Sequence, residues 1–143
     1  MAVWESSPPS LYHIVTGFFP ETSPRQTWAD NPRPLLCCGV AKDDESGTYF
    51  VRVAFGTTQN IHKAQPTDLV IGNLSMLNEL GLMKPTRFVI NAGSRMVVLP
   101  WTEEFFRPWT RPRKTSPILS KLPDEMRRYV GNVLGRLTDL PQF

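Results

Sequence analysis

The sequence has few of the residues that most often bind transition metals. It contains two cysteines and two histidines in 143 residues, so no zinc site can be read from it. The cysteines, Cys37 and Cys38, are adjacent in the chain. Neighbouring residues of a strand point to opposite faces, so a disulfide between them would need a strained backbone. We therefore expect two buried, reduced thiols and neither a metal nor another cofactor.

Long hydrophobic runs are also missing. No apolar run approaches the ~20 residues that a membrane-spanning helix requires, so no membrane partner is expected. The N-terminal residues MAVWESSPPS have neither the basic nor the apolar region of a secretory signal, and a cytoplasmic location is expected by default. This serine- and proline-rich stretch, residues 1–10, predicts a loose N-terminal arm. Residues 11–143 predict one domain.

Proline, in contrast, is abundant. Apolar residues make up 41% and charged residues 20% of the chain, as in a soluble globular protein that is long enough for one domain with a genuine core. The 14 prolines fall at expected strand ends and in connections. This distribution favours a small, mainly β fold with short strands.

The clearest pattern lies between Arg33 and Gln59. Two segments rich in β-branched, aromatic and other apolar residues, RPLLCCGV and TYFVRVAFGTTQ, flank the polar turn AKDDESG. This pattern is typical of two strands joined in a hairpin. Because antiparallel pairing brings the two outer ends of a hairpin together, we expect Arg33 to meet the hydroxyls of Thr57 and Thr58 at one edge of the sheet. Such a meeting would suit a phosphate.

Shorter patterns predict the other elements. Strands are expected at residues 11–19, 68–71, 86–91 and 95–100, the last two joined by a hairpin turn at 92–94. A short helix is expected at 73–80, with Asn73 as its N-cap and Gly81 as its left-handed stop. A C-terminal helix is expected to carry Pro123 in its first turn and an apolar stripe that ends at Leu137. Together these elements predict a five- to seven-stranded antiparallel barrel capped by a C-terminal helix.

The segment between these last elements, residues 105–117, is broken by prolines. Its aromatic residues, Phe105, Phe106 and Trp109, are expected either to pack the core or to mark an interface. The basic residues of this region fall without an acidic residue between them, and they are Arg107, Arg111, Arg113, Lys114 and Lys121. A polyanionic partner and a solvated basic loop both remain open as explanations.

The order of these motifs resembles the MazF/PemK family of toxins from toxin–antitoxin modules. The resemblance rests on an Arg-Pro before an apolar strand and a second strand that ends in a threonine turn. The later segments QNIHKAQPTDLVI, GLMKPTRFVI and LPWTEEFF are similar to the PemK-like branch. It extends over roughly residues 11–137. It implies a small SH3-like antiparallel barrel, usually dimeric, that cleaves single-stranded RNA without a metal and is neutralised by an antitoxin.

The resemblance also implies site residues. The catalytic arginine of the family falls on Arg33 and the catalytic threonine on Thr57, or on Thr58 if the register slips. Two positions depart from the family pattern: Tyr12-His13 replaces the Gly-Asp that commonly opens the first strand, and Gly56 replaces a bulkier residue before the threonine. The first departure bears on the shape of the RNA channel.

The chemistry of metal-free RNA cleavage suits these residue types. The 2′-hydroxyl of RNA can attack the adjacent phosphorus, so the enzyme must remove a proton, stabilise the phosphorane oxygens and protonate the leaving 5′-oxygen. The planar guanidinium of Arg33 can hold phosphate through two hydrogen bonds, and Thr57 can donate a third. His62 is the candidate general base. His13 and the pair Glu103 and Glu104 are more distant candidates.

RNA-binding residues are expected around this site. The long polar loop from Pro20 to Pro32 carries Arg25 and Trp28, which can grip a phosphate and stack on a base, although Trp28 can equally fold back over the barrel end. The other candidate RNA-binding residues are Gln59, Lys63, Arg87, Arg111, Arg113 and Lys114.

Two alternatives stay open. Arg33 can instead form a structural salt bridge, to Asp30 or Asp68, and Thr57 can be an ordinary strand-end residue. Separately, the chain can be a catalytically silent binding module, encoded by a phage or mobile element, that contacts a host protein or a nucleic acid. The long loop from Pro20 to Pro32, the aromatic and basic segment from Phe105 to Lys114 and the lack of a clear general base support this alternative. An antitoxin, by contrast, would lay an acidic or amphipathic segment over the RNA groove.

Overall fold

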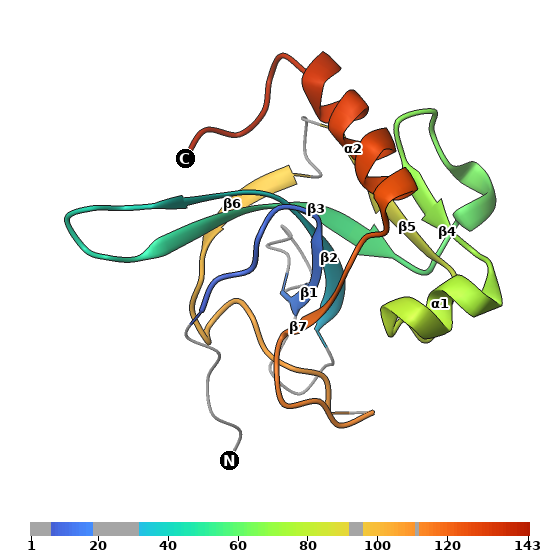
Figure 1. Ribbon diagram of the computed structural model, residues 1–143, viewed down its shortest axis with the longest axis horizontal. Coiled ribbons are helices and arrows are strands. Elements are labelled where there is room, and N and C mark those ends of the chain that lie inside the picture. The colour runs from blue at the N-terminus through green and yellow to red at the C-terminus, as the bar shows by residue number, and fades with distance from the viewer. Residues whose placement is uncertain (1–6, 19–31, 92–95, 111) are drawn as a thin grey trace.

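The computed structural model describes residues 7–18, 32–91, 96–110 and 112–143. In this part of the chain seven antiparallel strands form one curled sheet with two α-helices (Figure 1). The strands are β1 (His13–Gly17), β2 (Arg33–Lys42), β3 (Tyr49–Thr57), β4 (Leu69–Ile71), β5 (Thr86–Val89), β6 (Met96–Pro100) and β7 (Ile118–Lys121). The helices are the single 3₁₀ turn η1 (Ile61–Lys63), α1 (Leu74–Leu80) and the C-terminal α2 (Asp124–Arg136). The predicted mainly β fold, a small antiparallel barrel with a C-terminal helix, is confirmed.

Strand β3 is the centre of the sheet. The strand order is β4-β5-β3-β2-β1-β7, and β6 also pairs with β3. One edge of β3 therefore carries β2, while the other carries β6 along Phe50–Ala54 and β5 along Phe55–Thr57. The predicted hairpin between β5 and β6 is wrong for the described residues. Each of these two strands pairs with β3 instead, because β3 is long enough to hold both along one edge. The linker at 92–95 lies outside the described residues.

Both faces of the sheet are covered. Ile14, Leu36 and Cys38 pack in one hydrophobic cluster with the apolar sides of α1 and α2. Their neighbours Val15 and Cys37 pack in a second cluster, which contains Trp101 and Phe106. Because alternate residues enter two different cores, β2 reads in the sequence as a continuous apolar run rather than an alternating one. The expected buried, unbridged thiols are present at Cys37 and Cys38, and burial raises the pKa of Cys37 to about 11.

Several element boundaries differ from the prediction. The first strand begins only at His13, because Tyr12 has a φ of 76°, a conformation that interrupts an extended strand. Strand β7 was not predicted; it has four residues directly after Pro117 and carries little sequence signal. The arm is described only from Ser7, and within it Pro9 is buried while the Ser10 amide donates to His13 Nδ1 at 2.8 Å.

The helices begin and end close to the expected positions. Asn73 caps α1 by accepting a hydrogen bond from the Met76 amide at 3.2 Å, and Gly81 ends it with a φ of 76°. Helix α2 follows Pro123, which is its N-cap rather than part of its first turn, and buries Val130 and Val133 against the sheet. Neither helix, nor any other in the described residues, is long and apolar enough to cross a membrane.

Candidate active site at the end of the β2–β3 hairpin

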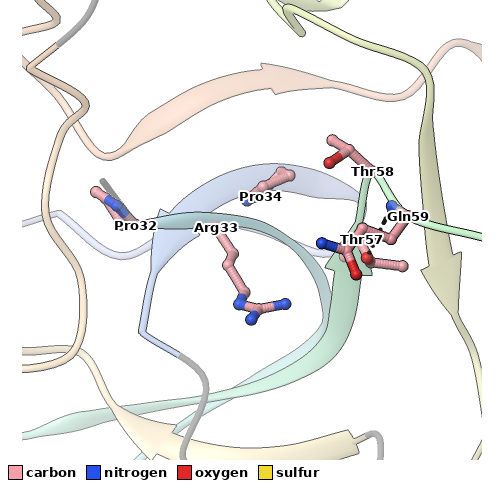
Figure 2. A pocket seen from close by; sticks show the side chains of 7 residues that line it. Pro32, Arg33, Pro34, Thr57, Thr58 and Gln59 are labelled. Atoms are coloured by element: carbon pink, nitrogen blue, oxygen red, sulfur yellow. Dashed lines mark hydrogen bonds between the residues drawn. The ribbon is translucent and has the colours of Figure 1, made fainter. Parts of the chain in front are cut away.

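The outer end of the hairpin brings Arg33 and Thr57 together. Strands β2 and β3 pair as far as Leu35 and Phe55, and Arg33 and Thr57 each lie two residues beyond this last pair. A pocket of about 330 Å³ opens there, and it is lined by Pro32, Arg33, Pro34, Gly56, Thr57, Thr58 and Gln59 (Figure 2). This cavity is called the Arg33 pocket below. Its lining residues come from two segments more than twenty positions apart in the chain.

Gly56 allows the two segments to approach so closely. A Cβ at this position would lie 2.1 Å from the Pro34 carbonyl oxygen and 2.9 Å from a ring carbon of Phe88. The first of these neighbours is backbone, so it cannot turn aside as a flexible side chain can. A residue larger than glycine therefore has little room where Gly56 of β3 approaches the backbone of Pro34 on β2.

The Arg33 side chain lies against an aromatic ring. Its guanidinium carbon is 4.6 Å from the centre of the Phe55 ring, within the range of a cation–π contact. Arg33 begins β2 and is half-buried, so its backbone is fixed by the sheet while its side chain lines the pocket. The ring restricts the plane of the guanidinium, which favours bidentate binding of an oxyanion over binding as a mobile point charge.

Thr57 is also oriented by its neighbours. Its hydroxyl oxygen accepts a hydrogen bond from the Gln59 amide at 3.1 Å, in the manner of a threonine turn. An accepting hydroxyl still has its own hydrogen to donate. Asn60, with a φ of 54°, then turns the chain into η1. The Thr57 hydroxyl can therefore donate toward a ligand in the pocket, and Thr58, which is exposed, lines the same wall.

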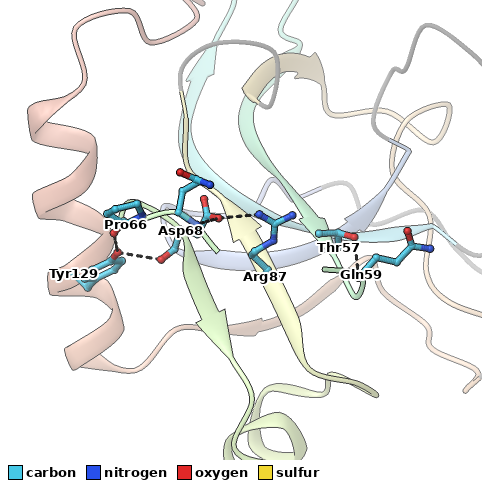
Figure 3. A network of polar contacts seen from close by, with 7 residues as sticks. Thr57, Gln59, Pro66, Asp68, Arg87 and Tyr129 are labelled. Carbon is cyan, nitrogen blue, oxygen red and sulfur yellow. Dashed lines mark hydrogen bonds and ion pairs between the residues drawn. The ribbon is translucent and has the colours of Figure 1, made fainter. Parts of the chain in front are cut away.

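Arg87 lies one strand away and has a different environment (Figure 3). It pairs with Thr57 across β3 and β5, but its Nη1 lies 3.1 Å from Asp68 Oδ2, and the side chains of Arg87 and Asp68 are 15% and 0% exposed. The same carboxylate oxygen accepts from the Gln65 amide at 2.9 Å. Arg87 does not line the Arg33 pocket. Its ion pair joins β5 to the connection before β4, which sequence reasoning did not find.

Helix α2 is joined to this network through Tyr129. The Tyr129 hydroxyl donates to the Pro66 carbonyl oxygen at 2.6 Å and lies 3.0 Å from that of Asp68 (Figure 3). Tyr129 belongs to the apolar stripe predicted for the C-terminal helix, but in the structure its hydroxyl forms a hydrogen bond with a backbone carbonyl. The ion pair and the tyrosine together fix the segment that follows the candidate site.

The other expected residues lie outside the Arg33 pocket or outside the described residues. His62 and Lys63 are exposed on η1 and do not line the pocket. Arg113 and Lys114 are exposed in the turn that starts at Trp109, whose carbonyl accepts from the Lys114 amide at 2.9 Å. Arg25, Trp28, Asp30 and Arg111 lie outside the described residues. Of the two salt bridges considered for Arg33, Asp68 pairs instead with Arg87.

The remaining candidates for proton transfer are separate from the pocket. His13 is half-buried on β1, and its pKa is lowered by desolvation and by the charge of Lys121. Glu103 and Glu104 are exposed in the turn after Trp101. Phe106 is fully buried in the core, and Trp109 is buried except for a small part of its surface. Within the described ranges, no group of three or more His, Cys, Asp or Glu side chains is arranged to hold a metal ion.

Comparison with known sequences adds no further assignment. No protein-family model matches the chain, and no curated protein matches it. The function is therefore argued from the pocket and its residues.

Proposed function

We propose that this protein is an endoribonuclease of the MazF/PemK toxin type, which cleaves single-stranded RNA by attack of the 2′-hydroxyl without a metal. The observation that carries the proposal is the Arg33 pocket. It combines a guanidinium held against Phe55 with an oriented threonine hydroxyl. A planar cation and a neutral donor at one cavity match the charge and geometry of a phosphodiester.

Each side chain has a defined part in the proposed reaction. As the 2′-oxygen attacks phosphorus, negative charge grows on the phosphorane oxygens. Arg33 stabilises this charge by two parallel hydrogen bonds, and the Thr57 hydroxyl donates a further one. Both groups are positioned before the substrate binds, so little reorganisation accompanies the reaction.

Proton transfer is the step for which the pocket supplies the fewest groups. None of its described lining residues is a histidine or a carboxylic acid. Two candidates remain: the Arg33 guanidinium itself, and His62, which follows the pocket turn on η1. Replacing His62 by alanine distinguishes them, since a ~10²–10⁴-fold loss of rate, the range of general acid–base catalysis, would assign the step to His62.

The proposal includes partners. A homodimer would extend the RNA-binding surface beyond one pocket, and an antitoxin would inhibit by covering the Arg33 pocket with an acidic or amphipathic segment. Exposed basic residues outside the pocket, Lys63, Arg113 and Lys114, would attract both the RNA and an acidic segment of the antitoxin.

The test is cleavage of a long RNA in the presence of EDTA. Arg33→Ala is expected to lower the rate at least ~10²-fold, as loss of a transition-state charge donor does, and to abolish growth inhibition. Arg136→Ala is the matched control, because it removes an exposed arginine in the last turn of α2 that does not line the pocket. Circular dichroism checks that both variants fold. If Arg33→Ala cuts RNA as fast as the parent protein, the catalytic assignment is wrong.

The second candidate function is a binding module without catalysis. It is favoured by the shortage of proton-transfer groups in the pocket. A protein that shifts RNA in a gel, loses this binding on Arg33→Ala and yields no cleavage products would support the module and contradict the nuclease.

A further inference from the structure

A second pocket adjoins the first. It measures about 290 Å³ and shares Pro34 and Thr58 with the Arg33 pocket. Its other walls include Trp109, from the connection after β6, and Met83, Lys84 and Thr86, from the turn and strand that follow α1. This cavity is called the Trp109 pocket below. A ligand bound in one pocket would therefore lie beside a ligand bound in the other.

The walls of the Trp109 pocket present mainly apolar surface. The Trp109 ring is 7% exposed, and its Nε1 donates to the Pro32 carbonyl oxygen at 2.6 Å. The Thr86 hydroxyl donates to the Lys84 carbonyl oxygen at 2.9 Å. Because the Trp109 N–H and the Thr86 O–H already donate to backbone carbonyls, these two residues present mainly apolar groups to a ligand in the pocket. Met83, which is 62% exposed, forms an adaptable rim.

Size and position restrict the occupant. The cavity is slightly smaller than the roughly 300–1,000 Å³ of pockets for drug-sized ligands, so it suits one small planar group. A ligand that places an anion on Arg33 and a flat apolar group on Trp109 has the composition of a nucleotide. An apolar side chain of a protein would fill the second pocket alone and leave the first without an anion. The exposed Lys84 at the rim adds a cation where a neighbouring phosphate would pass.

We propose that the Trp109 pocket is the subsite for a single nucleobase, that of the nucleotide adjoining the phosphate held by Arg33. The proposal rests on the proposed function, because it takes the Arg33 pocket to bind a phosphodiester. The base enters the cavity between the Met83 side chain and the part of Trp109 that reaches the pocket, and this is possible only for an unpaired nucleotide. The subsite therefore selects single-stranded RNA over duplex and makes Met83 a specificity-determining residue.

The experiment measures binding of uncleavable 2′-deoxy tetranucleotides by fluorescence polarisation at fixed salt. One base at a time is replaced by an abasic site. The parent protein is expected to bind the complete oligonucleotide about tenfold more tightly than the version that is abasic at one particular position, the size expected for one stacked base. Equal affinities at every position would overturn the subsite and leave the pocket to an apolar side chain of a partner protein.

Two matched variants assign this difference to the Trp109 pocket. Met83→Asp places a charge on its rim, and Leu74→Asp places the same charge on α1 at a side chain that is 73% exposed and does not line the pocket. Met83→Asp is expected to reduce the tenfold ratio to below about twofold, while Leu74→Asp preserves it, since stacking requires an apolar partner for the second face of the base. A ratio that is the same in both variants and in the parent would contradict the proposal.

Arg33→Ala separates this inference from the proposed function. It is expected to weaken binding of complete and abasic oligonucleotides by the same factor and so to leave their ratio unchanged, because phosphate contacts do not read bases. If Met83→Asp leaves the ratio intact while Arg33→Ala abolishes cleavage, the subsite is wrong and the nuclease stands. If Arg33→Ala cleaves normally but Met83→Asp removes the ratio, the base subsite stands and the catalytic role of Arg33 is wrong.

Discussion

Two arginines on different strands of the same sheet have different surroundings. Arg33 is stacked on Phe55 at the mouth of a pocket, whereas Arg87 lies against the buried carboxylate of Asp68, which also binds a backbone amide. Both lie near Thr57, since Arg33 lines the same pocket and Arg87 pairs with Thr57 across β3 and β5. The comparison shows how different the neighbours of two arginines in one sheet can be: an aromatic ring beside a pocket for Arg33, and a buried carboxylate for Arg87.

The difference follows from local packing. Contact with a ring restricts the plane of a guanidinium at the edge of a cavity, while pairing with a buried carboxylate joins two segments inside the fold. Residues of the second kind hold β4, β5 and α2 in place, and residues of the first kind line the cavity that this frame supports. The two regions should therefore respond differently to substitution.

Asp68→Asn should give the largest loss of stability. It leaves the largely buried Arg87 without its carboxylate, and breaking a buried ion pair in this way lowers the free energy of unfolding by about 3 kcal/mol or more. Urea denaturation measures the effect. Asp124→Asn is the control, because Asp124 pairs with Arg127 at the surface and its side chain is 79% exposed; its expected loss is below about 1 kcal/mol. Equal losses for the two variants would contradict the structural role of Arg87.

Gly56→Ala should give an intermediate effect that reaches both stability and the site. The added methyl would meet the Pro34 carbonyl oxygen at 2.1 Å, so β2 must move, at a cost of about 1–3 kcal/mol. Displacing Pro34 also moves the wall between the two pockets, and RNA binding should weaken. Gly72→Ala is the control, since a Cβ there meets nothing within 4 Å. Unchanged stability and binding in Gly56→Ala would contradict the close approach of β3 to β2 at Gly56 and Pro34.

The smallest effect concerns pH. Burial and, to a lesser extent, the charge of Lys121 lower the pKa of His13 in the folded protein. The unfolded state then binds more protons just below the ordinary histidine pKa, so stability is lost as the pH falls through that range. His13→Gln should remove this part of the acid sensitivity. Urea midpoints at pH 7 and pH 5.5 test it, and the same change in midpoint for both proteins would contradict the prediction.

Much of the fold could be predicted from local patterns. The β2–β3 hairpin follows from two apolar segments around a polar turn, and α1 follows from Asn73 and Gly81, whose capping roles depend only on neighbouring residues. The meeting of Arg33 with Thr57 also follows, because the pairing of a hairpin determines which ends come together. These features are set within short stretches of the chain.

The remainder depends on contacts between distant segments. Nothing local shows that β5 and β6 both pair with β3, that Asp68 takes Arg87 rather than Arg33, or that Tyr129 turns its hydroxyl to Pro66. The Trp109 pocket likewise joins Pro34, Met83 and Trp109, which come from three separate regions of the sequence. Such sites appear only once the sheet has curled.

The most direct test of the central claim, that Arg33 and Thr57 act on one phosphate, is a double-mutant cycle on RNA cleavage. Rates are measured in EDTA for the parent, Arg33→Ala, Thr57→Val and the double variant. Residues that act as a unit are strongly non-additive, so the double variant should be scarcely slower than Arg33→Ala alone. A double variant whose loss equals the product of the two single losses would show that the two side chains act independently, and would contradict the account.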